Sequence, residues 1–529
     1  MLNRNFLMLH VVLFLCVAYF SVNPWPSLML TVAQLVYVPI ALRLIVKKDD
    51  WFTKCYPFTF IPAYVAVVLL QLTTSPKWEI LFASVYLFFT VIVALYGLSR
   101  FFNRGFTHME EFSIDIGLMY LALGGAWFFA YVVGINTGFS PLITWLTAIH
   151  FHYSSFLLPL FIGLLGRIYK PAKYSIISSL LIVAPMVVAI GITFSRWLEL
   201  LSVLLYIIGI GGLIGMAWRA PFANKLQQWL VRVSFSALGV TIIFSLLYAL
   251  GNGFGLTSVD IDFMLRFHGL LNCVLFALFG IIGWTIAIPT PTFEMPRFPM
   301  SAIRGKWKIG QQVLNQIVKN KHRGLVDDMQ VYGHPLLSPR IINFYENTTD
   351  YRLVSRVKWQ KWFKPFAFLY TLASKKTQQI NLPFHDVKVE MTGDILSLKD
   401  GVDGRDHVRA WVRKIGEDTV FVALYSQHTT AQRTYMNIAL PLPFATMTGI
   451  LELNQIDNQL QLTSRKTSAT DSDAGIYLTF RNNQLFKLPI EENFLVHEKP
   501  DGTLRAKHQM WIFAWPFLTI DYWIERKAD

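Results

Sequence analysis

Two apolar stretches of the chain contain the polar side chains best placed to do chemistry. The first, PLITWLTAIHFHYSSFLLPLFIGLLG, runs from Pro141 to Gly166 and has no Lys, Arg, Asp or Glu. Its polar residues are His150, His152, Tyr153, Ser154 and Ser155. About 20 apolar residues span the hydrocarbon core of a bilayer, so this stretch predicts a transmembrane helix with a polar band inside it. Polar groups at such depth typically mark a functional site.

Pro159 predicts a kink in this helix, one turn beyond the histidines. Its ring removes the N–H that would bond to the carbonyl four residues back, which here belongs to Ser155. The second stretch, FMLRFHGLLNCVLFALFGIIGW, begins at Phe263 and contains His268 and Asn272. These two residues are four apart, so they share one face of a helix.

Composition indicates a polytopic membrane protein followed by a soluble region. The chain is 54% hydrophobic and 15% charged, whereas soluble domains average about 25% charged residues. Hydropathy predicts a transmembrane domain over 1–290, a membrane-surface segment over 291–380 and a β-rich domain over 381–529. We predict ten spans, at about 5–22, 24–46, 57–72, 79–98, 114–134, 141–166, 174–194, 198–218, 230–250 and 263–288.

Basic residues fall in alternate loops and set the predicted orientation. They are Arg4, Lys47, Lys48, Lys54, Arg100, Arg104, Arg167, Lys170, Lys173, Arg219 and Lys225. The opposite loops contain only Lys77 and Arg196. Because Lys and Arg are enriched in cytoplasmic loops, we expect a cell-membrane protein with both termini in the cytoplasm.

This orientation brings the two polar stretches to one layer of the membrane. The sixth span enters from outside, so His150 lies roughly 14 Å deep, near the bilayer centre. The tenth span also enters from outside. We therefore predict a small-molecule or lipid site formed by His150, Tyr153, Ser154, His268 and Asn272. The alternative is that these groups only join helices through hydrogen bonds, and this is the favoured interpretation for His10 and for His152.

Cofactor and metal chemistry stay open at this level. His150 and His268 have the residue type of paired axial haem ligands or of metal ligands. Cys16, Cys55 and Cys273 form no CxxC pattern, so no zinc site is indicated. No Walker, HExxH or GxSxG pattern occurs in its required context.

HMEEFSID, which contains Glu110, Glu111 and Asp115, is expected to cap a helix start. The pattern does not favour an enzyme.

The basic segment 297–323, RFPMSAIRGKWKIGQQVLNQIVKNKHR, is predicted to lie on an anionic lipid leaflet rather than to bind nucleic acid. Its lipid-facing basic residues would be Arg304, Lys306, Lys308, Lys319, Lys321 and Arg323. A second basic and aromatic run, 357–376, is expected on the same surface. From about Asp386, short runs of alternating polarity separated by DG, DNQ, NNQ and KPDG turns predict a cytoplasmic α+β domain with an antiparallel β-sheet or half-barrel. Such a sheet either holds an apolar ligand or, more commonly, fills its own core.

Several segments of both halves resemble the YndJ-like membrane proteins of bacilli. They are LTAIHFHYSSFLLPLFIGLLGR, HGLLN, INFYENTTDYRL, WVRKIGEDTVFVALYSQHT and RTYMNIALPLPFATMTGILELNQ. The resemblance implies a multi-pass plasma-membrane protein of a Gram-positive bacterium. It implies no activity, substrate or catalytic residue.

Three functions fit these patterns. The leading one is a transporter or permease, because kinked helices with polar groups near the bilayer middle form transporter sites, although no inverted repeat is evident. The second is a lipid-handling protein or membrane enzyme whose β domain carries an amphiphile. An enzyme would need a carboxylate near the histidines, and the outer loop offers Asp260 and Asp262. The third is a membrane sensor or scaffold.

The alternation of basic loops predicts the outcome of a topology experiment. A reporter that is active only outside the membrane should be silent when fused after Asp529 and active when inserted near Ser258. The reverse pattern would contradict the orientation, and with it the common depth of His150 and His268.

Overall fold

The structure is a computed structural model of the whole chain. It describes residues 4–21, 24–46, 50–73, 75–106, 108–255, 259–291, 298–309, 317–333, 337–399, 401–465, 472–480 and 485–527. The chain divides into two compact units, a membrane unit of Met1–Phe101 with Thr107–Phe293 and a barrel unit of Phe102–Phe106 with Glu294–Asp529. We treat each unit separately.

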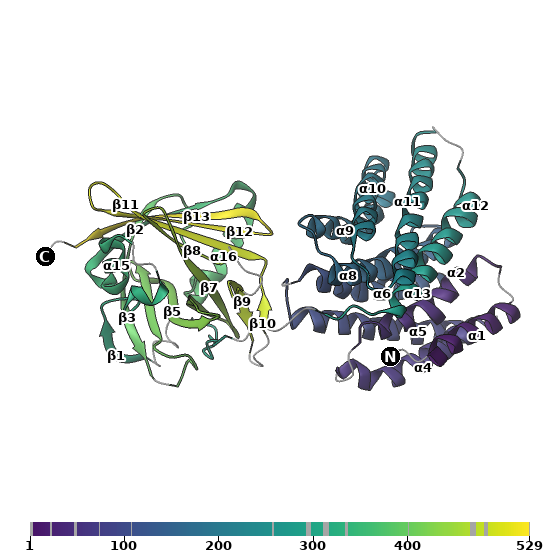
Figure 1. The fold of residues 1–529 in the computed structure, drawn as a ribbon, viewed down its shortest axis with the longest axis horizontal. Helices are drawn as coiled ribbons and strands as arrows, with labels where there is room; N and C mark the ends of the chain where they lie inside the picture. Colours follow the sequence, from purple (N-terminus) through teal and green to yellow (C-terminus); the bar gives the residue numbers. More distant parts are fainter. Residues whose placement is uncertain are drawn as a thin grey trace. The chain divides into compact units, whose positions relative to one another are not determined.

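The membrane unit is built from helices throughout its described residues (Figure 1). They are α1 (Arg4–Phe20), α2 (Ser27–Val32), η1 (Ala33–Tyr37), α3 (Val38–Arg43), α4 (Trp51–Leu70), α5 (Pro76–Phe102), α6 (Met109–Val133), α7 (Pro141–His152), η2 (Tyr153–Leu157), α8 (Leu158–Ile168), α9 (Tyr174–Phe194), α10 (Arg196–Arg219), α11 (Lys225–Phe254), α12 (Ile261–Phe263), η3 (Met264–Gly269), η4 (Asn272–Leu278) and α13 (Phe279–Ile286). Eight continuous stretches in this part are long and apolar enough to cross a membrane, and two shorter apolar helices precede them. The predicted membrane bundle of about ten helices is confirmed.

Two of the helices are interrupted by π-helical turns immediately before a proline. The turn η2 ends at Leu157, whose successor Leu158 donates its N–H to the Tyr153 carbonyl, five residues back. Pro159 follows as the second residue of α8. The turn η1 precedes Pro39 in the same way. A wider turn at these points lets the helix continue past a residue that has no N–H to donate. The π-helical turn η2 thus lies where the sequence predicts a kink, and the kink itself stays a prediction.

Thirteen strands of the barrel unit form one antiparallel sheet (Figure 1). They are β1 (Ile317–His322), β2 (Tyr351–Trp359), β3 (Lys388–Leu398), β4 (Arg409–Ile415), β5 (Asp418–Thr430), β6 (Arg433–Leu442), β7 (Ala445–Ile456), β8 (Gln459–Thr463), β9 (Gly475–Thr479), β10 (Leu485–Lys487), β11 (Ile490–Glu498), β12 (Leu504–Ile512) and β13 (Trp515–Arg526). The sheet closes into a barrel because the short strand β8 pairs with β7 on one side and with β11 on the other. The predicted antiparallel sheet is confirmed, and it is a closed barrel rather than a half-barrel.

Two helices lie at opposite ends of the barrel. The helix α15 (Pro339–Glu346) lies where β2 begins, and Asn343 accepts a hydrogen bond from the Tyr351 hydroxyl there. The helix α16 (Lys364–Thr377) follows the other end of β2. We call these the α15 end and the α16 end. Strand register places the turn between β12 and β13 at the α16 end.

Gln379 joins the chain after α16 to the barrel wall. Its side-chain amide donates to the carbonyls of Val422 (3.0 Å) and Pro441 (2.9 Å) and accepts from the Val422 N–H (2.9 Å). Strands β5 and β6 pair only as far as Leu424 and Ala439, and Pro441 has no N–H of its own. The Gln379 amide therefore completes the hydrogen bonding where the two strands separate.

The predicted surface segment 297–323 is only partly within the described residues, since Arg297 and 310–316 lie outside them and the side chain of Lys319 is not described. Ile303 and Ile309 are buried against the barrel, and 317–322 form β1. Arg304 donates to Thr446 (2.9 Å), and Lys321 pairs with Asp394 (3.0 Å). Lys306, Lys308 and Arg323 are exposed. The membrane-surface role of these basic residues stays a prediction.

Candidate functional site

The structure brings the two predicted histidines of the membrane unit together. The rings of His150, near the end of α7, and His268, in η3, have their centroids 6.3 Å apart. His268 Nδ1 donates to the Thr241 carbonyl (3.0 Å), because a carbonyl can only accept. His268 Nε2 then accepts from Asn272 Nδ2 (3.2 Å), and Asn272 Oδ1 accepts from Thr241 Oγ1 (2.9 Å). His268 is thus a neutral imidazole with both nitrogens engaged.

His150 differs from His268 in having one ring nitrogen without a hydrogen-bond partner among the described residues. Its Nδ1 donates to the Leu146 carbonyl of its own helix (2.7 Å), which makes Nε2 the acceptor nitrogen. Nε2 has no hydrogen-bond partner among the described residues, and the side chain is exposed at the surface of the unit. Ser154, half-buried, donates to the His150 carbonyl (2.8 Å) rather than to a ring. The arrangement offers one basic nitrogen beside a hydrogen-bonded His–Asn pair.

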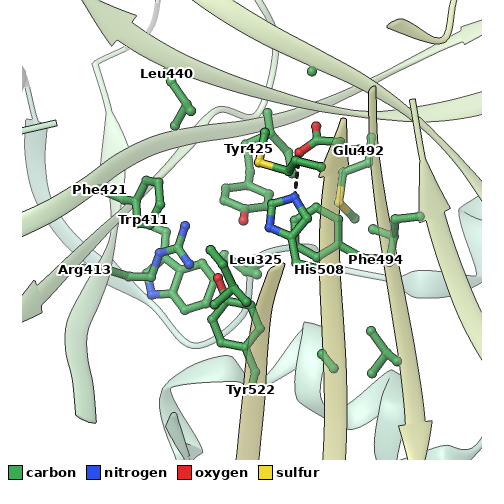
Figure 2. Close-up of a pocket in the computed structure, with 18 of the residues that line it drawn as sticks. Leu325, Trp411, Arg413, Phe421, Tyr425, Leu440, Glu492, Phe494, His508 and Tyr522 are labelled. Atoms are coloured by element: carbon green, nitrogen blue, oxygen red, sulfur yellow. Dashed lines mark hydrogen bonds and ion pairs between the residues drawn. The ribbon is translucent and has the colours of Figure 1, made fainter. Parts of the chain in front are cut away.

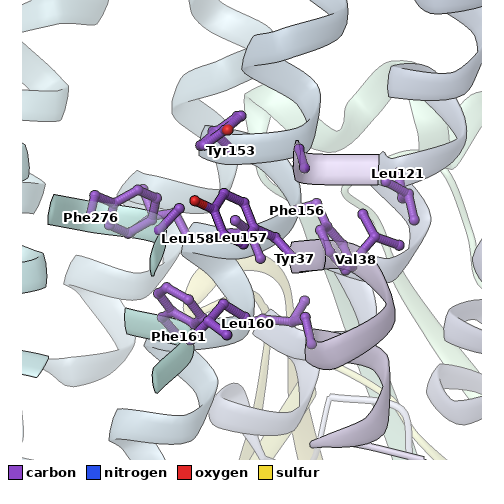
Figure 3. Close-up of a cluster of buried hydrophobic side chains, with 14 of the residues drawn as sticks. Tyr37, Val38, Leu121, Tyr153, Phe156, Leu157, Leu158, Leu160, Phe161 and Phe276 are labelled. Carbon is purple, nitrogen blue, oxygen red and sulfur yellow. The ribbon is translucent and has the colours of Figure 1, made fainter. Parts of the chain in front are cut away.

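Tyr153 lies apart from the histidines, in a buried cluster where three interrupted helices meet (Figure 3). Its hydroxyl donates to the Met29 carbonyl (2.7 Å) and contacts Cys273 Sγ (3.3 Å). The Tyr37 hydroxyl donates to the Cys273 carbonyl (2.9 Å), and the two tyrosine rings are 6.0 Å apart. Tyr37 ends η1, Tyr153 begins η2 and Cys273 lies in η4. The cluster therefore ties together backbone turns that have irregular hydrogen bonding.

His152 and His10 are buried and bonded to neighbouring helices. His152 Nδ1 donates to the Ala148 carbonyl (2.8 Å), so Nε2 accepts from the Tyr86 hydroxyl (2.7 Å). His10 Nδ1 is 2.9 Å from the Leu35 carbonyl oxygen. Both arrangements join helices to one another.

The acidic residues at the start of α6 form buried ion pairs. Arg167 binds Glu111 through Nε (2.6 Å) and Nη2 (3.0 Å), while Arg100 binds Asp115 (2.7 Å) and Glu111 (3.0 Å). Lys170 pairs with Glu110 at 2.8 Å. These residues join the ends of α5 and α8 to the start of α6 in addition to any effect on the helix dipole. In the described part of the chain no group of three or more His, Cys, Asp or Glu side chains is arranged to hold a metal ion.

The barrel contains a cavity, which the sequence pattern allowed as the less common alternative to a filled core. It has a volume of about 150 Å³ and is lined mainly by aliphatic and aromatic side chains from both sides of the barrel. Phe344 and Tyr345 of α15 line it, and so do Ile380 and Leu382, which follow α16. The closed barrel and the helix at the α15 end thus line a mostly apolar space.

A few polar side chains extend into this cavity (Figure 2). Glu492 Oε2 and His508 Nε2 are 3.0 Å apart and lie on one side. On the other side the Arg413 guanidinium lies 4.4 Å from the centroid of the Trp411 ring and 4.2 Å from that of Phe421. Arg413 Nε is buried and has no hydrogen-bond partner. Burial raises the pKa of the Tyr425 hydroxyl, which also lines the cavity, to about 12, so this group stays neutral.

Comparison with known proteins identifies relatives but no function. A family model described as "YndJ-like protein" matches residues 28–276. The chain is 37% identical over 486 residues to the "Uncharacterized membrane protein YndJ" of Bacillus subtilis (strain 168), with 90% of this chain and 87% of that protein covered. The match extends into both units. No solved structure matches the chain significantly.

The contact between the sixth and tenth spans predicts a selective cross-link. In a background without Cys16, Cys55 and Cys273, the pair His150→Cys and His268→Cys should react with a short bifunctional reagent, because the native rings are in near contact. The pair His152→Cys and His268→Cys should not react, since His152 faces Tyr86. Gel mobility of the full-length protein in native membranes measures both. Equal reaction of the two pairs would contradict the arrangement.

Proposed function

Because this multi-pass membrane protein belongs to the YndJ-like family, we propose a function within the membrane system, namely the handling of a lipid or other amphiphile. In this proposal the barrel cavity holds the apolar part of the ligand. The single observation that supports it is a mostly apolar cavity of about 150 Å³ inside a closed barrel.

The size of the cavity limits what it can hold. An apolar cavity of about 150 Å³ stays dry and binds benzene in another protein. The barrel therefore accommodates a short apolar segment rather than a whole phospholipid. Burial of each methylene contributes about 0.8 kcal/mol, so even such a segment supports binding.

A permease-like function is a second candidate, supported by the His150–His268 contact. The acceptor nitrogen of His150 lies beside the His268–Asn272 pair, and the interrupted backbone of η2 and η3 lies in the same two spans. Irregular backbone and polar side chains at the middle of spans form binding sites in transporters. We also retain the cell membrane, with both termini in the cytoplasm, as part of the proposal.

A matched pair of tryptophan substitutions tests the lipid-handling proposal. Leu440→Trp places a large ring in the cavity that Leu440 lines. Leu495→Trp makes the same change on β11 between two cavity-lining residues, Phe494 and Val496, so its side chain points out of the barrel. Full-length protein is purified, and its retained lipids are extracted and quantified by mass spectrometry. We expect wild type and Leu495→Trp to retain one amphiphile that Leu440→Trp loses.

Circular dichroism and gel filtration of each variant verify folding before lipids are compared. Overpacking costs about 1–3 kcal/mol, which a closed barrel should tolerate. Identical lipid content in all three folded proteins would refute a ligand in the cavity.

A further inference from the structure

Arg413 is the one guanidinium that lines the barrel cavity among the described residues. It follows Trp411 on the inward face of β4, since alternate residues of a strand point to the same side. Contacts with Trp411 and Phe421 provide cation–π attraction. Arg413 also interacts with the Tyr522 hydroxyl. None of these neighbours carries a negative charge.

The carboxylate of the cavity is already engaged. Glu492 is bound by His508 at 3.0 Å, and among the described residues no carboxylate lies within ion-pair distance of Arg413. Arg413 Nε has no partner at all. The Arg413 side chain as a whole is half-buried, and a charge partly removed from water is stabilised by a counter-charge. The cavity thus has an apolar lining and one cation that lacks an anion.

We propose that Arg413 binds the anionic group of an amphiphile whose apolar segment fills the barrel cavity. This inference rests on the lipid-handling function proposed above and names the ligand class. An oxyanion is required, because the planar guanidinium binds carboxylate or phosphate oxygens through two parallel hydrogen bonds. A fatty acid and an alkyl phosphate share this chemistry.

Three ligands that differ only in the polar group test the assignment. Octanoate, octyl phosphate and 1-octanol are titrated calorimetrically into the full-length protein in nanodiscs, with empty nanodiscs as the blank. We expect wild type to bind at least one of the two anions more tightly than the alcohol. Arg413→Gln should weaken binding of that anion about tenfold to a hundredfold, the range for a hydrogen bond to a charged group, and leave octanol unchanged. Comparison of the two anions separates a carboxylate ligand from a phosphate ligand.

Arg505→Gln is the matched control. Arg505 also lies over a tryptophan ring, with its guanidinium 4.9 Å from the centroid of Trp523, but it adjoins the cavity-lining Ala506 and points out of the barrel. This variant should bind as wild type does.

Unchanged octanol binding by Arg413→Gln reports that the cavity is intact. Undiminished anion binding by Arg413→Gln would overturn the role of Arg413 and leave the proposed function standing. Failure of all three ligands to bind wild type would refute both.

The outer surface of α16 is apolar, which is the reverse of the usual distribution on a helix of a soluble domain. Its buried residues are small, Ala367 and Ser374, each 0% exposed. Its large apolar residues face outward: Phe366 is 58% exposed, Leu369 63% and Leu372 59%. A helix on a soluble domain normally buries such residues and exposes polar ones. Exposed apolar surface of this extent marks an interaction site.

The surroundings of α16 indicate the partner. Trp362 and Trp515, both exposed, lie beside its start with ring centroids 6.3 Å apart. The exposed basic residues on and next to the helix are Lys361, Lys364, Lys375 and Lys376. Exposed aromatic and aliphatic groups combined with lysines are the features of a segment that lies in the interface of an anionic membrane.

We infer that α16 docks on the surface of an anionic lipid leaflet. A fluorophore sensitive to polarity is attached to Leu369→Cys in a background without native cysteines, and the full-length protein is placed in nanodiscs. Emission should shift to the blue in anionic lipid compared with zwitterionic lipid. The shift should decrease as salt rises, since salt screens the attraction between the lysines and the anionic headgroups.

Asn458→Cys, exposed in the turn between β7 and β8 near the α15 end, is the control site and should show no shift. Replacing Lys375 and Lys376 by Glu should abolish the shift at Leu369→Cys. Emission that is blue-shifted equally in both lipids and at all salt concentrations would indicate burial against a second copy of the chain and would overturn the assignment.

Discussion

Every backbone N–H and C=O group removed from water needs a partner, and both units are organised by this requirement. In a bilayer the requirement favours helices, whose groups bond within one segment. Where Pro39 and Pro159 remove a donor, a π-helical turn precedes each proline and the helix continues. The barrel meets the same requirement by closure through β8, so the strands of the ring have neighbours on both sides. Gln379 supplies side-chain hydrogen bonds at the point where β5 and β6 separate.

The sequence was sufficient to predict most helices and strands, but not to predict that the sheet closes into a barrel. Long apolar runs identify membrane helices because the bilayer sets their length. Alternating polarity identifies most strands, although the final run LRAKHQMWIFAWPFLTIDYWIER contains both β12 and β13, with a turn at Phe513 and Ala514. Closure depends on β8, which is five residues long, and on β2, which lies in a basic and aromatic region typical of a membrane surface. The run QLQLTSRK predicts a strand at β8, but no local signal shows that this strand has a partner on both sides or that β2 belongs to the sheet.

The candidate site residues also divide into those whose positions the sequence predicted and those whose positions it did not. Depth and helical phase were enough to predict that His150, His268 and Asn272 lie near one another. They were not enough for Tyr153, which lies where α7 meets the π-helical turn η2 and whose ring packs against Tyr37. The cavity had a weak signal in WVR, where Arg413 shares the inward face of β4 with Trp411. An arginine on an alternating strand is ordinarily exposed, so only the closed barrel shows that it lies inside.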